Sequence, residues 1–393
     1  MSMDLESTAL QNPLVFTQVA WASQRVKLAV ISTTVFFFLL TLVHHHDGLT
    51  SVSTRWRARP GDANDEQFTP SVDYIPKDDV DWSRFAYTQY VTNSEYLCNS
   101  VMLFETLHRL GSRANRVIMY PSTMLDDQAG PAEGKGDNAR LLAKARDEYK
   151  VHLVPIVVQS RPNMNDRTWA ESFTKLLAWN NTEYDRVIHL DSDATVLQPM
   201  DELFLLPACA VAMPRAYWLY PKKKILASTL MVLQPSAVEL ARITDAISHA
   251  GAGDYDMEIV NKLYGDSALV LPHRRYGLLT SEFRRDRHDH VKYLGTDQEK
   301  WDPVAAYNEA KFVHFSDWPV PKPWRGPSGE VMKSREPKCH EVPVAGKDGT
   351  YSLEESCAER DIWYGLYEDF ARRRERVCEG GIEAQKSNRK WRM

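Results

Sequence analysis

A pair of aspartates that follows an apolar run limits the fold of this chain more than any other feature. Residues 186–206 read RVIHLDSDATVLQPMDELFLL, with Asp191 and Asp193 one residue apart after a run of valine, isoleucine and leucine. Such runs are typical of parallel strands that are covered on both faces, and open α/β sheets bind ligands at the carboxyl ends of these strands. The sequence therefore predicts an α/β fold with two carboxylates in a binding crevice.

The spacing of the two aspartates fits a metal site. Alternate residues of an extended segment point the same way, so both carboxylates can reach one hard divalent cation, Mn²⁺ or Mg²⁺, which can bridge a diphosphate. A lone D-x-D is also common by chance, and a pair of solvated acids at the start of a loop is the other interpretation.

A second segment supports the metal interpretation. Residues 311–324 read KFVHFSDWPVPKPW, in which a short apolar strand ends at His314, an imidazole that can complete a metal site. Lys322 follows eight residues later and is a compact charge suited to a phosphate. A histidine that is simply satisfied at a strand end is the alternative for His314.

With these blocks, the chain resembles glycosyltransferase family 8, the glycogenin and galactinol synthase type of retaining transferase. The resemblance runs from about Phe85 to Trp324. It implies a GT-A-like, Rossmann-related mixed sheet flanked by helices and a UDP-sugar as donor. It also implies an Mn²⁺ (or Mg²⁺) ion held by Asp191, Asp193 and His314.

The same resemblance assigns residues to the nucleotide and the diphosphate. FAYTQYVTNSEY looks like the family's first strand and uridine-binding turn. The residues placed around the nucleotide are Tyr90, Thr92, Asn93 and Tyr96. Asp191 also contacts the donor. Lys322 matches the lysine of the family's His-x-x-Gly-x-x-Lys-Pro-Trp, although this chain has a two-residue insertion there and lacks the glycine.

Further blocks concern the donor sugar. TKLLAW resembles the helix before the D-x-D strand, where the family has a donor-contacting lysine, here Lys175. Ala227, Ser228 and Thr229 stand where the family has Asn-Ala-Gly against the sugar, so the asparagine is lost. DYDMEIVN carries Asp256 at the family's aspartate and Met257 where the family usually has glutamine. These substitutions look like those of fungal glucose N-acetyltransferase-like proteins, which suggests UDP-N-acetylglucosamine as donor.

The implied reaction is a transfer with retention to a glycan or glycoprotein acceptor. In a retaining enzyme the acceptor attacks from the face that the leaving group vacates, or a carboxylate intervenes covalently. Asp256 is the carboxylate that the resemblance offers as catalytic residue, and Lys175 is expected to neutralise it. A surface charge is the alternative for either residue.

The amino-terminal segment predicts a membrane anchor. Leu28 to His46 is uncharged and close to the ~20 residues that a spanning helix needs. We therefore expect a single-pass type II protein of the Golgi membrane with its catalytic domain in the lumen. A cleaved signal peptide is the rival interpretation. The expected parts are a cytosolic tail (1–24), a signal-anchor helix (25–46), a stem (47–81), a GT-A domain (82–330) and a helical carboxyl-terminal extension (331–393).

The five cysteines show no C-x-x-C spacing, so a structural zinc site is not expected. Cys98 and Cys209 lie in apolar stretches and are predicted to be small core residues. One disulfide is possible among Cys339, Cys357 and Cys378 in an oxidising lumen, and an odd count leaves at least one thiol free.

Composition is that of a globular enzyme, with 43% hydrophobic residues and a net charge of −5, which gives no electrostatic reason to expect nucleic acid. Strand-like and helical runs alternate from about residue 85, as in a mostly parallel sheet. The aromatic residues of segment 354–378 recur at helical spacing, which predicts a helix packed on the domain.

Two other functions fit parts of the sequence. HLDSDATV also matches the signature of haloacid dehalogenase-like phosphatases, in which Asp191 would be the nucleophile and Asp193 the acid. In that family, however, the aspartate strand opens the domain, whereas here about a hundred residues of alternating elements precede it. A membrane-anchored, sugar-binding protein without catalysis is the third hypothesis.

Overall fold

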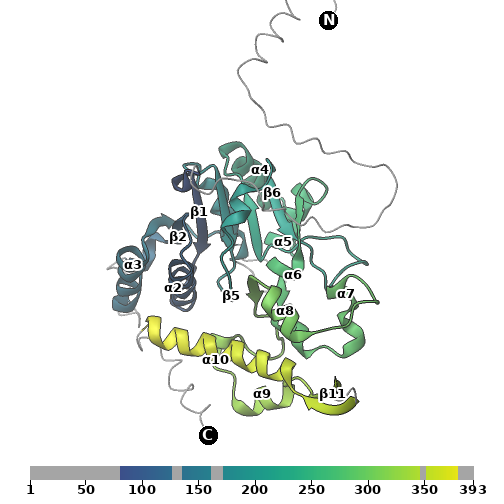
Figure 1. The fold of residues 1–393 in the computed structure, drawn as a ribbon. Helices are drawn as coiled ribbons and strands as arrows, with labels where there is room; N and C mark the ends of the chain where they lie inside the picture. Colours follow the sequence, from purple (N-terminus) through teal and green to yellow (C-terminus); the bar gives the residue numbers. More distant parts are fainter. Residues whose placement is uncertain (1–79, 126–134, 161–170, 346–350, 379–393) are drawn as a thin grey trace, which may run out of the picture. The chain divides into compact units, whose positions relative to one another are not determined.

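The computed structural model describes residues 80–125, 135–160, 171–345 and 351–378 (Figure 1). The strands are β1 (Phe85–Tyr90), β2 (Asn115–Pro121), β3 (Val151–Ile156), β4 (Arg186–Leu190), β5 (Ala194–Val196), β6 (Val211–Pro214), β7 (Leu230–Leu233), β8 (Leu269–Leu271), β9 (Leu278–Leu279), β10 (Phe312–His314), β11 (His340–Ala345) and β12 (Tyr351–Ser356).

The α-helices are α2 (Ser94–Arg109), α3 (Lys135–Tyr149), α4 (Ala237–Ser248), α5 (Asp256–Tyr264), α6 (His273–Tyr276), α7 (Val291–Leu294), α8 (Pro303–Glu309), α9 (Gly329–Arg335) and α10 (Ala358–Cys378). The 3-10 segments are η1 (Trp82–Arg84), η2 (Ser122–Leu125), η4 (Ser172–Asn180), η5 (Asp201–Leu205), η6 (Thr280–Arg284), η7 (Arg287–His290) and η8 (Pro323–Arg325).

A seven-stranded sheet in the order β3-β2-β1-β4-β7-β6-β8 forms the centre of the described residues. Strands β1 to β4 pair in parallel, as does β6 with β8, whereas β7 runs antiparallel to both β4 and β6. The sheet is therefore mixed, as predicted, and β1 and β4 end side by side. In such sheets the carboxyl ends of adjacent parallel strands form the binding edge.

Strand alternation buries the sheet on both faces. In β1, Tyr87 belongs to one apolar cluster and Ala86 to the other. In β4, Ile188 and Val187 divide in the same way. Helices α2, α3 and α10 contribute to the first cluster, and η4, α4 and α5 to the second. This two-sided burial explains why the strands read as continuous apolar runs.

Two smaller sheets complete the described structure. Strand β10 lies between β5, which is antiparallel to it, and β9, which is parallel to it. Strands β11 and β12 form a hairpin, and the Cys339–Cys357 disulfide closes its base. The disulfide predicted for the carboxyl-terminal cysteines is thus confirmed for this pair.

The final described element is the 21-residue helix α10, which crosses the lower part of Figure 1 and contacts α2, α8, η6 and η8. Its side chains Trp363, Leu366, Tyr367 and Phe370 are buried, which confirms the predicted aromatic face. The predicted start was wrong, because residues 354–356 belong to β12 and the helix begins at Ala358. Cross-strand pairing with β11 overrides helical periodicity there.

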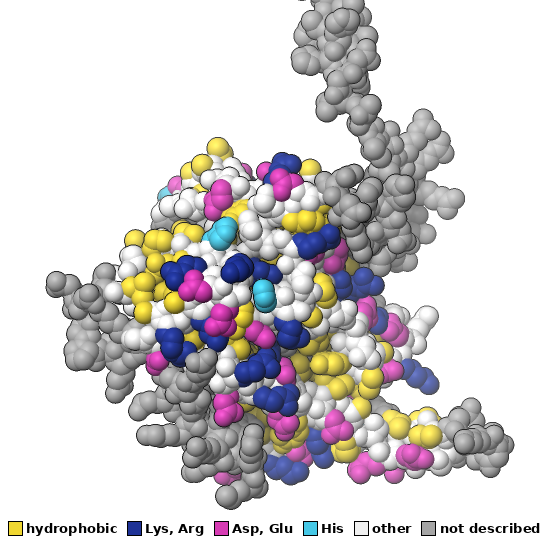
Figure 2. Space-filling view, turned by 60° about the vertical axis from the view of Figure 1, so that its left-hand side comes forward, with side chains coloured by type: hydrophobic (Ala, Val, Ile, Leu, Met, Phe, Trp, Pro, Cys, Tyr) yellow, Lys and Arg dark blue, Asp and Glu magenta, His cyan; other side chains and the backbone are white. Residues whose placement is uncertain are grey.

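Other predictions fall outside the described residues. The cytosolic tail, the anchor at 25–46 and nearly all of the stem belong to residues 1–79, which are not described. Among the helices of the described ranges, none has the length and apolar character that a membrane span requires. Figure 2, which brings the α2 and α3 side forward, shows basic and acidic side chains interspersed over that face.

Candidate active site

The aspartate pair lies at the carboxyl end of β4, and the backbone fixes it there. The N–H of Asp191 donates to the carbonyl oxygen of Thr229 over 2.9 Å, which joins the pair to the segment before β7. Strand β5 follows at once and pairs with β10 so that Ala194 stands opposite His314. This register brings the predicted histidine beside Asp193 from more than a hundred residues away.

The outer cluster consists of Asp193, His314 and Lys322. Nε2 of His314 is 3.0 Å from Oδ1 of Asp193, and Nζ of Lys322 is 2.6 Å from its Oδ2. The lysine also donates to the carbonyl oxygen of Phe315, so the loop from β10 folds back onto its own start. At 30% side-chain exposure, Lys322 is the most accessible member and can be reached by a ligand.

The inner cluster consists of Lys175, Asp191, Ser228 and Asp256. Nζ of Lys175 lies 2.8 Å from Oδ1 of Asp191 and 2.7 Å from Oδ2 of Asp256. The hydroxyl of Ser228 donates to the same Oδ2 over 2.7 Å. Lys175, carried by η4, is only 5% exposed at its side chain. The predicted neutralisation of Asp256 by Lys175 is confirmed, and Asp191 shares the lysine.

The surroundings of Asp191 and Asp193 shift the pKa values of the two carboxyl groups in opposite directions. Burial raises the pKa of Asp191 to about 6, and the neighbouring Asp193 carboxylate also raises it. Lys175 and His314 lower the pKa of Asp191, but by less. Burial also opposes ionisation of Asp193, but His314 and Lys322 hold its pKa well below the ordinary value. Burial alone would lower the pKa of Lys175. The carboxylates of Asp191 and Asp256 outweigh burial and hold this pKa well above its usual range.

The donor set fits a divalent cation. One ligand atom from each of Asp191, Asp193 and His314 lies within 4.8 Å of the others. Two carboxylates and an imidazole suit Mn²⁺, and carboxylates with water suit Mg²⁺. Within the described ranges, the other such group includes Cys339 and Cys357, whose sulfurs are joined in a disulfide and offer no thiolate.

The segment predicted to surround a nucleotide lies next to the outer cluster. Tyr90 ends β1, and its ring stacks on His189 of β4 at 5.7 Å. Asn93 caps α2, because its side chain accepts the N–H groups of Glu95 and Tyr96. The Tyr96 ring packs edge-on against Trp324, two residues after Lys322, at 5.6 Å.

The remaining predicted residues take different places. Thr92 is partly exposed in the turn between β1 and α2, and Thr229 offers its backbone carbonyl to Asp191. Because the amide oxygen of Asn93 is engaged in capping, its amide N–H groups and the neighbouring residues are what this turn can offer a ligand. Residues 180–182 read Asn-Asn-Thr, an N-glycosylation sequon, and Asn180 is exposed at the end of η4.

Several supporting residues were not predicted. Asp317 lies buried in the loop between His314 and Lys322, and the motif gave no sign of its role. Arg373 and Arg374 are also buried. They follow Phe370 by three and four residues, so helical spacing could have placed them on the same face of α10.

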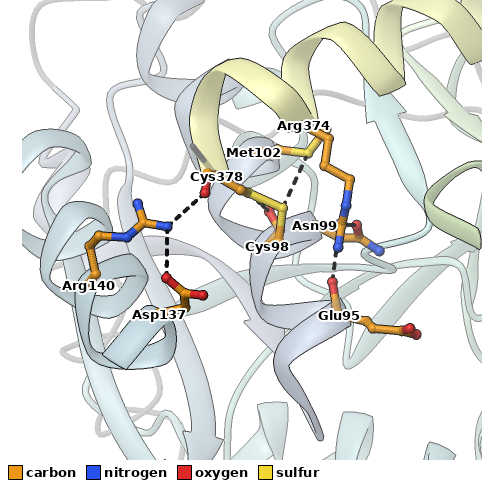
Figure 3. Close-up of a disulfide and its surroundings, with 8 residues drawn as sticks. All are labelled: Glu95, Cys98, Asn99, Met102, Asp137, Arg140, Arg374 and Cys378. Atoms are coloured by element: carbon orange, nitrogen blue, oxygen red, sulfur yellow. Dashed lines mark hydrogen bonds and ion pairs between the residues drawn. A yellow bond between two sulfur atoms is a disulfide. The ribbon is translucent and has the colours of Figure 1, made fainter. Parts of the chain in front are cut away.

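Cys98 is a buried core residue, as predicted, but its disulfide was not predicted. Cys98 in α2 forms a disulfide with Cys378 at the end of α10, across 280 residues of sequence (Figure 3). Burial in an apolar stretch is common to core and disulfide cysteines, so local sequence could not separate them. Cys209 is the free cysteine of the described residues and is partly buried.

The chain is similar to curated fungal proteins named Glucose N-acetyltransferase 1. It is 56% identical over 315 residues to that of Gibberella zeae, covering 79% of this chain and 66% of the relative. It is 48% identical over 319 residues to that of Aspergillus fumigatus, covering 78% and 80%. The Saccharomyces cerevisiae protein of that name is 27% identical, with 81% and 87% covered. No family model matches the chain.

Proposed function

Because this chain is a glycosyltransferase of the fungal glucose N-acetyltransferase 1 family, we propose that it transfers a sugar from a UDP-sugar to a glycan or glycoprotein acceptor. The proposed reaction proceeds with retention and depends on Mn²⁺ or Mg²⁺. The relatives' name favours an N-acetylhexosamine, and UDP-N-acetylglucosamine is the donor that we propose. The alignment spans 66% of the length of the Gibberella zeae relative, just under two thirds.

One observation carries the metal-dependent part of the proposal. Asp191, Asp193 and His314 converge at the carboxyl ends of the strands, with Lys322 bound to the same Asp193. A bound divalent cation would supply charge to meet the diphosphate as it leaves. This arrangement of two carboxylates, an imidazole and a movable lysine suits a nucleoside diphosphate because that leaving group develops negative charge.

Lys322 is the residue that we propose for the diphosphate. In the structure its ammonium group is held by the Asp193 carboxylate and one carbonyl oxygen, at a partly exposed position. A phosphate oxygen can replace the carbonyl oxygen of Phe315 as the partner of the Lys322 ammonium group. The ammonium group then still has a hydrogen-bond acceptor. The ammonium group would then bind the diphosphate in the ground state and more strongly in the transition state, where the departing UDP gains negative charge.

Asp256 is the residue that we propose for the sugar. Lys175 and Ser228 both direct hydrogen bonds to its Oδ2. These bonds leave Oδ1 available to a sugar hydroxyl or to the positively charged reacting carbon. The shared lysine fixes the distance between Asp256 and the aspartate pair, and so between the sugar and the diphosphate. Thr229 and Ser228 would line the same side of the sugar.

Two competing functions lose support. In the phosphatase interpretation Asp191 would be a nucleophile, but its Oδ1 is bound by Lys175 and three parallel strands precede β4 in the chain. The relatives described above carry a transferase name as well. A sugar-binding protein without catalysis would not need the charge placed at Asp193, Lys322 and Asp256.

The proposed location is the Golgi membrane, with the segment 25–46 as an uncleaved anchor and the catalytic domain in the lumen. The exposed Asn180 of the sequon supports access by lumenal enzymes. Resistance of the protein to carbonate extraction tests the anchor. A shortened, soluble product would identify the segment as a signal peptide instead.

The direct test of function is UDP release by the full-length chain purified in detergent. We expect release from UDP-N-acetylglucosamine in the presence of Mn²⁺, with other UDP-sugars as comparisons. Chelation should abolish the release, and added Mn²⁺ should restore it. Full activity in excess chelator would contradict the metal-dependent mechanism, and activity with another UDP-sugar alone would correct the donor.

A further inference from the structure

Helix α10 contacts three of the segments that carry the candidate donor site: the loop between His314 and Lys322, strand β5 and helix α2. Near its start, Trp363 donates from Nε1 to Asp317 over 3.1 Å, and the Tyr367 hydroxyl donates to the other carboxylate oxygen over 2.9 Å. Asp317 is 3% exposed and stands in the loop between His314 and Lys322. A buried carboxylate with two such donors fixes the loop, because moving it would leave polar groups unpaired.

The second half of α10 also reaches the aspartate segment. Arg373 donates from Nη2 to the hydroxyl of Thr195 over 2.6 Å and from Nη1 to the hydroxyl of Thr106 over 2.9 Å. Thr195 belongs to β5, two residues after Asp193. The planar guanidinium thus joins β5 to α2 with directed bonds.

The end of α10 holds the first turns of α2. Arg374 donates from Nη1 to Oδ1 of Asn99 over 2.5 Å and to the carbonyl oxygen of Glu95 over 3.3 Å. One turn further on, Cys378 is bonded to Cys98 (Figure 3). Both contacts act on the part of α2 that directly follows the turn of residues 91–93. That turn sits beside the aspartates because β1 and β4 run in parallel and end together.

The two ends of α10 therefore hold two different parts of one site. Trp363 and Arg374 are 11 positions apart in one continuous helix, which corresponds to about 16 Å. One rigid element thus spans the interval between the Lys322 loop and the turn before α2. A nucleoside diphosphate that binds both parts needs this interval to be constant.

We propose that α10 sets this interval, with Arg374 as a positioning residue that acts on the nucleotide through the α2 turn. This inference rests on the proposed function. Arg374 does not touch the donor, so its loss displaces the turn while the outer cluster keeps its own contacts. Donor binding then weakens, whereas the chemistry of a bound donor is largely retained.

The experiment measures UDP affinity by calorimetry with Mn²⁺, and donor KM and kcat by UDP release, on the full-length chain. Arg374→Met should raise the UDP Kd and the donor KM about tenfold, because binding must then supply about 1.4 kcal/mol to order the displaced turn. Its kcat should stay within about threefold of the wild type. Arg374→Lys, which keeps the charge and one donor, should restore part of the affinity.

Arg376→Met is the matched control. Arg376 lies two positions further along the same helix, is 60% exposed and pairs with Glu105 of α2 at 3.2 Å. Its removal deletes an arginine and an α2 contact without touching the first turns. UDP affinity should not change.

A second pair of variants covers the case in which Arg374→Met does not fold. Replacing Cys98 and Cys378 together by alanine frees the same end of α10, and UDP affinity should fall. Replacing Cys339 and Cys357 together removes the hairpin disulfide instead and should leave UDP affinity unchanged.

The outcomes separate the two claims. If the wild-type chain binds UDP and the folded Arg374→Met or Cys98/Cys378 variants bind it with a Kd within about twofold of the wild type, the role of α10 is contradicted. The proposed function is not affected by that result. A wild-type chain that binds no UDP contradicts the proposed function, and the inference with it.

Discussion

The inner and outer clusters are built from the same kinds of residue but differ in how their charges are balanced. In the inner cluster, Lys175 stands between Asp191 and Asp256, and Ser228 adds a hydrogen bond. In the outer cluster, a single carboxylate, Asp193, takes both the imidazole and the lysine. The charged groups of the inner cluster are paired with one another. In the outer cluster, the Lys322 ammonium group and the metal-ligand atoms can be reached by a substrate.

This difference suggests separate roles for the two clusters, one in positioning the substrate and one in binding charged groups. Buried charges that are fully paired resist rearrangement, because breaking one pair leaves an uncompensated ion. Partly exposed charges exchange partners at low cost, because water screens them. We therefore attribute geometry at the sugar to the inner cluster. Binding of the metal and diphosphate is attributed to the outer cluster together with Asp191, the inner-cluster carboxylate that is also a proposed metal ligand.

The largest effect on activity is expected from the outer cluster. Asp193→Ala should lower UDP-sugar turnover about a thousandfold, because it removes a metal ligand and the partner of Lys322. The melting temperature should fall only modestly, since Lys322, the more exposed of the two cations left behind, can turn to water. Asp245→Ala, at a side chain that is 75% exposed, is the control for removing an aspartate. Turnover by Asp193→Ala close to that of the control would remove the metal site from the account.

The largest effect on stability is expected from the inner cluster. Lys175→Met leaves two carboxylates in a buried site and should lower the free energy of unfolding by about 3–5 kcal/mol. Lys322→Met in the outer cluster should cost about 1 kcal/mol or less. Chemical denaturation of both variants gives the comparison. Equal losses would show that the two clusters do not differ in the way described.

A smaller effect is expected from Ser228. Ser228→Ala deletes one hydrogen bond to Asp256 and should reduce kcat about tenfold while UDP affinity stays unchanged. Ser248→Ala removes an exposed serine hydroxyl of α4 and serves as its control. If Ser228→Ala weakened UDP binding as strongly as it slowed turnover, the separation of the clusters would be incorrect.

Much of this site was predictable because its residues are tied to strand ends. Asp191 and Asp193 follow an apolar run that becomes β4, and His314 ends a second run that becomes β10. Strand order then brings them together, since β10 pairs with the strand that follows the aspartates. Local pattern and pairing rules suffice for such residues.

The contacts of α10 were not predictable in the same way. Helical spacing could have placed Arg373 and Arg374 on the buried face of α10, but it does not reveal their acceptors on β5 and α2. The partner of Cys98 lies 280 residues away, and no local pattern indicates it. Such pairings depend on how α10 packs across the domain, which helical periodicity alone does not determine.

The most direct test of the division between the clusters compares Lys322→Ala with Asp256→Asn. UDP affinity is measured by calorimetry and kcat by UDP release for both. Lys322→Ala should weaken UDP binding and lower turnover together, because its charge meets the diphosphate in the ground state and meets more negative charge in the transition state. Asp256→Asn should lower kcat and leave UDP affinity nearly unchanged. An Asp256→Asn enzyme with near-native kcat, or a Lys322→Ala enzyme that binds UDP as the wild type does, would contradict the account.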